Sequence, residues 1–178
     1  LERTPRRRAR ISLRLSGRQR PTLFFGVPTL YAAMLSAAEQ PSGDALALRR
    51  CVSAGEALPE AVGRRFGELF GVEILDGIGS TEMLHIFLSN QPGRVRYGST
   101  GEPVPGYEVR LLDENGADVA GEEIGDLVIR GPSAASQYWN QRVKTRATFE
   151  GEWTRTGDKY ELTEAGRFIY CGRTDDMF

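Results

Sequence analysis

Polar side chains gather in a glycine-rich stretch whose residue types suit the binding of a flat, charged ligand. The stretch is Asp76-Gly77-Ile78-Gly79-Ser80-Thr81-Glu82, and it directly follows the apolar run 72–75. Glycine lets the backbone turn sharply and approach a ligand closely, and ligands of open α/β sheets bind where strands end. A strand-to-helix turn with Ser80 or Thr81 as the helix cap explains the same residues. The stretch alone leaves both interpretations open.

Two residues of this stretch could serve the phosphates of a nucleotide. Mg²⁺ prefers one or two carboxylates together with phosphate oxygens and water. Glu82 is therefore a candidate metal ligand, and Thr81 a candidate phosphate ligand. The chain has a single histidine, His85, which excludes a histidine-based metal cluster. The absence of a Gly-x-Ser-x-Gly motif argues against a nucleophilic serine hydrolase.

A second set of polar residues lies near the end of the chain. The two carboxylate oxygens of Asp158, which follows Thr156-Gly157, could accept hydrogen bonds from both hydroxyls of a ribose. Arg173 could add a charge-assisted contact to the sugar or to a phosphate. Taken alone, Asp158 is more typical of a turn than of a ribose site, and Arg173 is typical of a protein surface. The pair Asp175-Asp176 fits a solvated hinge better than an acid/base pair.

The composition is that of a soluble globular protein with many turns. Hydrophobic residues make up 40% of the 178 residues, with 21 glycines and 9 prolines, and a domain of this length buries about two-thirds of its unfolded surface. No apolar run approaches the roughly 20 residues of a membrane span. We expect a cytoplasmic protein without a membrane partner, in which Cys51 and Cys171 are buried free thiols.

The charge is concentrated at the start of the chain. Residues 1–20 carry eight arginines and one glutamate, so the remaining residues carry 15 basic and 23 acidic side chains. Such an arm could bind nucleic acid, but it has no aromatic residues of the kind that stack on single strands. We expect an irregular arm over 1–20 and no nucleic-acid partner.

The middle of the chain alternates in α/β fashion. Apolar runs at 22–27, 48–53 and 72–75 predict three buried parallel strands. Pro28 begins one predicted helix, and Pro59 opens another that Gly71 closes. This pattern predicts an α/β subdomain over 21–97, with a partial parallel sheet and flanking helices.

The last part of the chain is β-rich. Asn115-Gly116 lies between the runs 107–112 and 125–130, and Glu164-Ala165-Gly166 lies between 159–163 and 167–171. Both patterns are typical of antiparallel strands joined by turns. The sequence predicts a mostly antiparallel, barrel-like subdomain over 98–178.

Four motifs occur in the order and spacing of the adenylate-forming enzymes, which this chain resembles from about residue 18 onward. They are Ser53-Ala54-Gly55-Glu56-Ala57, the stretch 76–82, Thr156-Gly157-Asp158 and Gly172-Arg173-Thr174-Asp175-Asp176. The context Phe24-Phe25-Gly26-Val27-Pro28-Thr29-Leu30-Tyr31 is most similar to benzoate- and hydroxybenzoate-CoA ligases.

The resemblance implies a role for each position. It places Ser53, Ala54, Gly55, Glu56 and Ala57, with Asp76, Gly77, Ile78 and Gly79, around the adenine. It gives catalytic roles to Thr81 and Glu82 at the phosphates and Mg²⁺, and ribose binding to Asp158 and Arg173. It places Ile78, Gly79 and His85 at an aryl carboxylate pocket, which suits an apolar wall with few polar groups.

The implied reaction joins a small aromatic carboxylate to CoA at the expense of ATP. The carboxylate attacks ATP to give an acyl-adenylate, and the CoA thiol then displaces AMP. The lysine-containing phosphate loop and the small C-terminal domain of the family do not occur in this sequence. We expect an internal part of an aryl-CoA ligase that is not catalytically competent alone and that could self-associate through an exposed apolar face. The alternative is a non-catalytic nucleotide-binding or structural domain.

Overall fold

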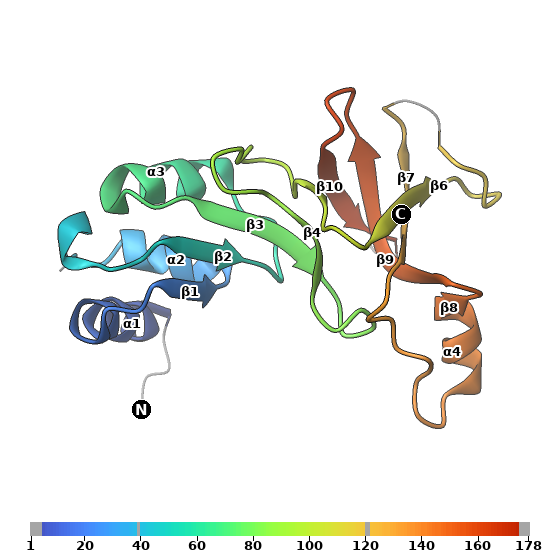
Figure 1. Cartoon of the computed structure of the whole chain (residues 1–178), viewed down its shortest axis with the longest axis horizontal. Helices are drawn as coiled ribbons and strands as arrows, with labels where there is room; N and C mark the ends of the chain where they lie inside the picture. The colour runs from blue at the N-terminus through green and yellow to red at the C-terminus, as the bar shows by residue number, and fades with distance from the viewer. Residues whose placement is uncertain (1–4, 39, 120–121, 175–178) are drawn as a thin grey trace. The chain divides into compact units, whose positions relative to one another are not determined.

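The computed structural model describes residues 5–38, 40–119 and 122–174, so Asp175 and Asp176 lie outside the described residues. The chain divides into two compact units. The first contains the described residues up to Gly77 together with Asn90–Gly98, and the second contains Ile78–Ser89 and the described residues from Ser99 onward. Figure 1 shows the helices and strands of each unit.

Parallel strands form the sheet of the first unit. They are β1 (Leu23–Gly26), β2 (Arg50–Ser53) and β3 (Ile74–Gly79), of which the last two residues belong to the second unit. The register pairs Gly26 with Ser53, and Ser53 with Asp76. The carboxyl ends of the three strands therefore meet at one edge, which is where α/β sheets bind ligands.

The helices of this unit follow the predicted signals. Helix α2 (Pro28–Leu35) has proline in its first turn, and α3 (Glu60–Phe70) ends at Gly71, which has a left-handed φ of 68°. A short 3₁₀ turn, η1 (Gly43–Ala45), precedes β2. The α/β class predicted from the sequence is confirmed.

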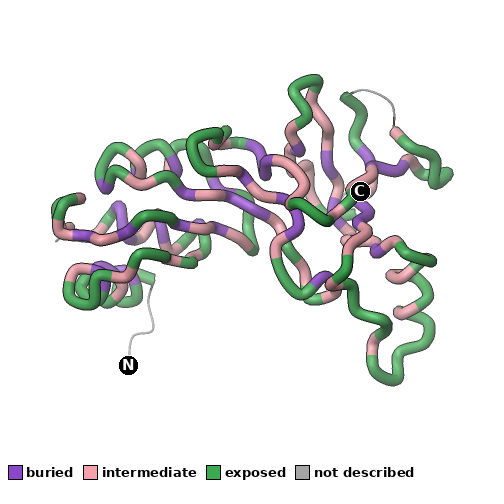
Figure 2. The backbone as a smooth tube through the Cα atoms, in the orientation of Figure 1, coloured by how far each residue is buried: buried purple, intermediate pink, exposed green. Residues whose placement is uncertain are grey.

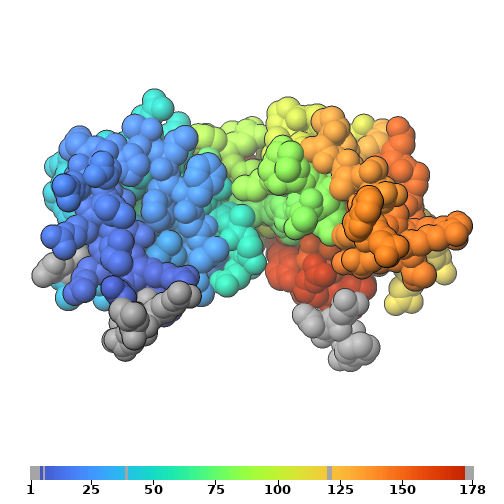
Figure 3. All heavy atoms as spheres, turned by 90° about the horizontal axis from the view of Figure 1, so that it is seen from below, coloured from blue at the N-terminus to red at the C-terminus, as the bar shows by residue number. Residues whose placement is uncertain are grey.

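The predicted irregular arm is wrong, because helix α1 spans Pro5–Gln19. Ala9, Leu13 and Ser16 are buried, and their spacing of four and three residues places them on one helical face. Helix α1 lies on the surface of the first unit, where it packs against α2 (Figure 3). Apolar burial on this face is what holds an arginine-rich segment in a helix.

Aromatic side chains form the centre of the first core. Phe66 lies against Tyr31 and Phe70, with ring centroids 5.1 and 4.6 Å apart. The Tyr31 hydroxyl donates to the Val52 carbonyl over 2.8 Å, so this buried polar group is satisfied. Figure 2 shows buried residues along β2 and β3, whereas Phe25 on β1 is 70% exposed.

The second unit is mostly antiparallel. Its main sheet has the order β10-β9-β7-β6, and β8 also pairs with β9. Bulges interrupt β9–β10 and β7–β9, and such bulges increase local bend and twist. The elements of this unit are β4 (Ile86–Ser89), β5 (Glu102–Pro103), β6 (Glu108–Leu112), β7 (Ile124–Arg130), α4 (Arg142–Thr148), β8 (Phe149–Glu150), β9 (Trp153–Leu162) and β10 (Phe168–Arg173).

Three local expectations need correction. Strand β3 continues through Gly79, so Asp76 to Gly79 are strand and not loop, and a turn into β4 follows instead of a helix. Helix α4 was not predicted. Cys51 is a buried free thiol as expected, whereas Cys171 is only partly buried. Within the described ranges, no helix combines the length and apolarity that crossing a membrane requires.

Candidate active site

Two buried polar side chains lie side by side at the strand ends of the first unit. Ser53 and Asp76 are register partners on β2 and β3, with side-chain positions 0% and 7% exposed. Burial raises the pKa of Asp76 to about 7, although the Leu58 amide and the Ser53 hydroxyl act in the opposite direction. Among the described residues, neither Ser53 Oγ nor Asp76 Oδ1 has a hydrogen-bond partner of good geometry. Unsatisfied buried oxygens of this kind are unusual and require an explanation.

The loop after β2 is open to solvent. Gly55, Glu56 and Ala57 are exposed and Ala54 is partly buried. Gly55 has a φ of 91°, a conformation that favours glycine. At the end of the loop, the Leu58 amide lies 3.5 Å from Asp76 Oδ2, which ties the loop to β3. Gly77, next to Asp76, is buried.

In the second unit, a tight turn carries the predicted catalytic pair. The Met83 amide donates to Ser80 Oγ over 3.3 Å, which closes a turn around Thr81 and Glu82. Thr81 is exposed. An added Cβ on Gly79 would lie 2.5 Å from the His85 carbonyl oxygen, so only glycine permits this close approach. Leu84 has a left-handed φ of 72°.

Glu82 is held by a tyrosine that sequence reasoning did not identify. The Tyr138 hydroxyl donates to Glu82 Oε1, and Lys144 Nζ lies 4.1 Å from the centre of the Tyr138 ring. Burial alone would raise the pKa of Glu82, but the Tyr138 hydrogen bond and the Lys144 charge help to hold it below its ordinary value. Glu82 is therefore an ionised carboxylate at neutral pH.

His85 belongs to a chain of hydrogen bonds in the same unit. Its Nδ1 lies 2.8 Å from the Ile86 carbonyl oxygen, and its Nε2 lies 3.2 Å from the Tyr107 hydroxyl. Tyr107 in turn lies 2.6 Å from Ser133 Oγ. Neither Tyr107 nor Ser133 was predicted as a site residue.

Asp158 and Arg173 are brought together on paired strands. They are register partners in β9 and β10, and Arg173 Nη1 donates to Asp158 Oδ1 over 3.1 Å. Gly157 has a φ of 74°, and an added Cβ would lie 3.0 Å from Arg173 Nη2. Burial raises the pKa of Asp158, which is 7% exposed, and the Arg173 charge opposes that shift.

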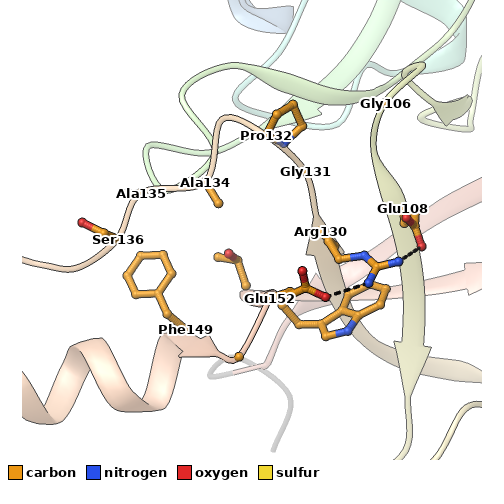
Figure 4. A pocket seen from close by; sticks show the side chains of 13 residues that line it. Gly106, Glu108, Arg130, Gly131, Pro132, Ala134, Ala135, Ser136, Phe149 and Glu152 are labelled. Atoms are coloured by element: carbon orange, nitrogen blue, oxygen red, sulfur yellow. Dashed lines mark hydrogen bonds and ion pairs between the residues drawn. The ribbon is translucent and has the colours of Figure 1, made fainter.

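A separate cavity of about 450 Å³ lies in the second unit (Figure 4). Arg130 donates to Glu108 and Glu152 across its wall, over 2.5 and 2.9 Å. The Arg130 guanidinium also lies 5.2 Å from the centre of the Trp153 ring. None of the predicted site residues lines this cavity.

The predicted site residues thus fall into two groups. Ser53 to Ala57, Asp76 and Gly77 belong to the first unit, and Ile78, Gly79, Thr81, Glu82, His85, Asp158 and Arg173 belong to the second. The residues that sequence reasoning missed hold Glu82 and His85 from distant parts of the chain: Tyr138 lies 56 residues after Glu82, and Tyr107 lies 22 residues after His85. Local sequence patterns contain no signal for such pairs.

A parallel sheet with polar strand ends, followed by a mostly antiparallel sheet, defines the large domain of an adenylate-forming enzyme. The chain belongs to the AMP-binding enzyme family, whose model matches residues 1–139. The benzoate–CoA ligase of Thauera aromatica is 60% identical over 161 residues, which are 90% of this chain and 31% of that protein.

Solved structures agree with this assignment. The structure of a benzoate CoA ligase from Burkholderia xenovorans LB400 has a TM-score of 0.93 and 58% identity, over 96% of this chain and 35% of that one. The anthranilate CoA ligase AuaEII in complex with anthranoyl-AMP has a TM-score of 0.91 and 45% identity, over 98% and 34%. The chain spans about a third of the length of these relatives.

Proposed function

We propose that this chain forms the adenylate-binding part of an ATP-dependent aryl-CoA ligase whose substrate is benzoate or a hydroxybenzoate. In this reaction the substrate carboxylate attacks the α-phosphate of ATP, which gives an acyl-adenylate and pyrophosphate. The CoA thiol then displaces AMP to give the aryl thioester. The supporting observation is the close match, over 98% of this chain, to a ligase structure that holds an aryl adenylate.

We assign the adenosine half of the ligand to polar side chains and backbone segments of the predicted site. Ser53 and Asp76 supply buried oxygens without good partners, which suits the recognition of a ligand amine or hydroxyl. Residues 54–57 and Gly77 to Gly79 supply backbone that a planar base can approach. Asp158, fixed by Arg173, supplies carboxylate oxygens for two ribose hydroxyls.

Thr81 and Glu82 would serve the phosphates. Glu82 fits Mg²⁺, because it is ionised and its Oε1 is oriented by Tyr138. Among the residues that the structure describes, no group of three or more acidic, histidine or cysteine side chains could hold a metal, so phosphate oxygens and water would complete the coordination. When bound, Mg²⁺ neutralises phosphate charge. Ile78, Gly79 and His85 would border the aryl ring.

No observation favours the alternative of a non-catalytic or structural domain. The relatives reported above are CoA ligases by name, and the chain retains all the motif residues that the family resemblance assigns. The polar groups at the strand ends also carry a cost in stability, which a purely structural domain has no reason to maintain.

Calorimetric titration of the chain with a non-hydrolysable benzoyl-adenylate analogue tests the proposal. We expect saturable binding, and we expect Asp158→Ala to weaken it by at least tenfold, because two charge-assisted hydrogen bonds are lost. AMP shows whether the adenosine half binds by itself. The matched control is Asp118→Ala, which removes a carboxylate that pairs with Arg110 at the surface of the same unit.

Equal weakening by both variants would show that the effect is not specific to the site. A folded chain that binds neither ligand would contradict the proposal for this chain.

A further inference from the structure

Both ring nitrogens of His85 are engaged within the protein. A carbonyl oxygen can only accept, so the 2.8 Å contact with Ile86 requires a proton on Nδ1. In the neutral ring Nε2 is then the acceptor, and the Tyr107 hydroxyl donates to it over 3.2 Å. With both nitrogens engaged, the ring can present only carbon edges and faces to a ligand.

Tyr107 is itself fixed in place. Its hydroxyl lies 2.6 Å from Ser133 Oγ, which lies 2.6 Å from the Met83 carbonyl oxygen. Because the Tyr107 proton goes to Nε2, Ser133 is the donor in both contacts and shares its one proton between the Tyr107 and Met83 oxygens. The Tyr107 and His85 rings meet edge to face, with centroids 5.7 Å apart and an interplanar angle of 80°. An added Cβ on Gly131 would lie 2.3 Å from the Tyr107 ring, so the phenol packs directly on glycine backbone.

The backbone of His85 is also fixed. The His85 carbonyl lies so close to the backbone of Gly79 that a Cβ at this position would clash with it. The His85 amide donates to the Met83 carbonyl over 2.9 Å. Met83 therefore accepts hydrogen bonds from both His85 and Ser133. The imidazole and its phenol partner are parts of one connected arrangement within the second unit.

We propose that Tyr107 is a specificity-determining residue, which keeps the His85 wall of the aryl pocket apolar by occupying Nε2. This inference rests on the proposed function, which places His85 beside the aryl ring of the substrate. A hydroxyl on that ring would meet carbon and lose its hydrogen bonds to water, whereas an unsubstituted ring loses none. The arrangement favours benzoate over 4-hydroxybenzoate.

Tyr107→Phe tests this role with little change in shape. The variant keeps the packing on Gly131 and leaves Nε2 free to accept a hydrogen bond from a substrate hydroxyl. We expect the affinity ratio of 4-hydroxybenzoyl- to benzoyl-sulfamoyl adenosine to rise about three- to tenfold, as for one hydrogen bond gained. The affinity for the benzoyl compound should stay within twofold. Ser133→Ala, which releases the phenol from its anchor, should shift the ratio in the same direction by less.

The matched control is Tyr160→Phe, which removes a hydroxyl that contacts Thr100 in the buried core of the same unit. It should leave the affinity ratio unchanged. A merely structural effect of losing a tyrosine hydroxyl would weaken both ligands together, and would not alter their ratio.

Nitrogen NMR of the imidazole provides an independent measurement, because His85 is the only histidine in the chain. In the neutral ring we expect the proton on Nδ1, and an Nε2 shift that changes in Tyr107→Phe but not in Tyr160→Phe. A neutral ring protonated on Nε2 would overturn the inference, as would an unchanged affinity ratio in Tyr107→Phe. If a folded wild-type chain binds neither analogue, the proposed function fails and the specificity role fails with it, whatever the NMR result.

Discussion

Asp76 is a buried carboxyl that the fold stabilises poorly, and replacing it should stabilise the protein. Its pKa rises from 3.8 to about 7, with burial as the main cause. Asp76→Asn keeps the shape of the side chain and an oxygen for the Leu58 amide. The substitution removes the ability to ionise and replaces one carboxyl oxygen with an amide NH2 group.

The magnitude follows from proton linkage. A carboxyl whose pKa is higher in the folded state than in the unfolded state favours folding at low pH and opposes it at high pH. The free-energy cost of ionising Asp76 in the folded state is absent below pH 3.8, grows as the pH rises toward 7, and is constant above pH 7. A shift of this size corresponds to about 4 kcal/mol, at 1.36 kcal/mol per pKa unit.

Urea unfolding of both proteins at pH 4 and pH 8 measures this effect. We expect Asp76→Asn to be more stable than wild type by several kcal/mol at pH 8, and by less than about 1 kcal/mol at pH 4. The control Asp44→Asn, in the exposed turn η1, should change stability little at either pH. Equal stability of wild type and Asp76→Asn at pH 8 would refute the reasoning. So would an advantage of the variant that is larger at pH 4.

Two further substitutions test the core and the Glu82 site. Phe66→Ala empties the centre of the first core and should cost about 3–5 kcal/mol in urea unfolding, whereas Phe25→Ala, at an exposed position, should cost far less; similar losses would contradict the core assignment. Tyr138→Phe removes a hydrogen bond that lowers the pKa of Glu82, so carboxyl-carbon NMR should show Glu82 titrating at higher pH than in wild type. The stability that this bond contributes is present above the ordinary pKa of Glu82 and is lost as the pH falls, and an unchanged titration would argue against the bond.

Apolar runs, together with the proline and glycine signals, were sufficient to predict several elements of the first unit, although β1 has no buried residue and is not the buried strand that was expected. The expected strands and helices of the first unit appear as β1, α2, β2 and α3, and Gly71 ends α3 as predicted. Helix α1 was missed because its buried face consists of the small residues Ala9 and Ser16 around a single leucine. Helix α4 has no buried residue, so its sequence has no periodic pattern of apolar residues from which a helix could be predicted.

The site was predictable where its residues lie on elements with a local signal. The turn at Gly166 predicts the pairing of β9 with β10, and that pairing places Arg173 opposite Asp158. Tyr138 has no such signal, because it reaches Glu82 across 56 residues of sequence. The division of the chain into subdomains at residue 97 remains a prediction, since residues 78–89 group with the second unit.

Gly79 and Gly131 show why the role of a residue cannot be predicted from its type alone. The sequence interpretation of Gly79 was a sharp turn, but Gly79 is a strand residue whose φ lies outside the left-handed region. What it contributes is the absence of a Cβ, where the His85 carbonyl comes close. Gly131 does the same for the Tyr107 ring. Both glycines leave room for a neighbour that is distant in the sequence or comes close only in the folded chain, so their role depends on the tertiary structure. Alanine at Gly79 would displace His85, and alanine at Gly131 would displace the Tyr107 ring that contacts it. Either change would alter the atoms that a substrate hydroxyl meets at His85.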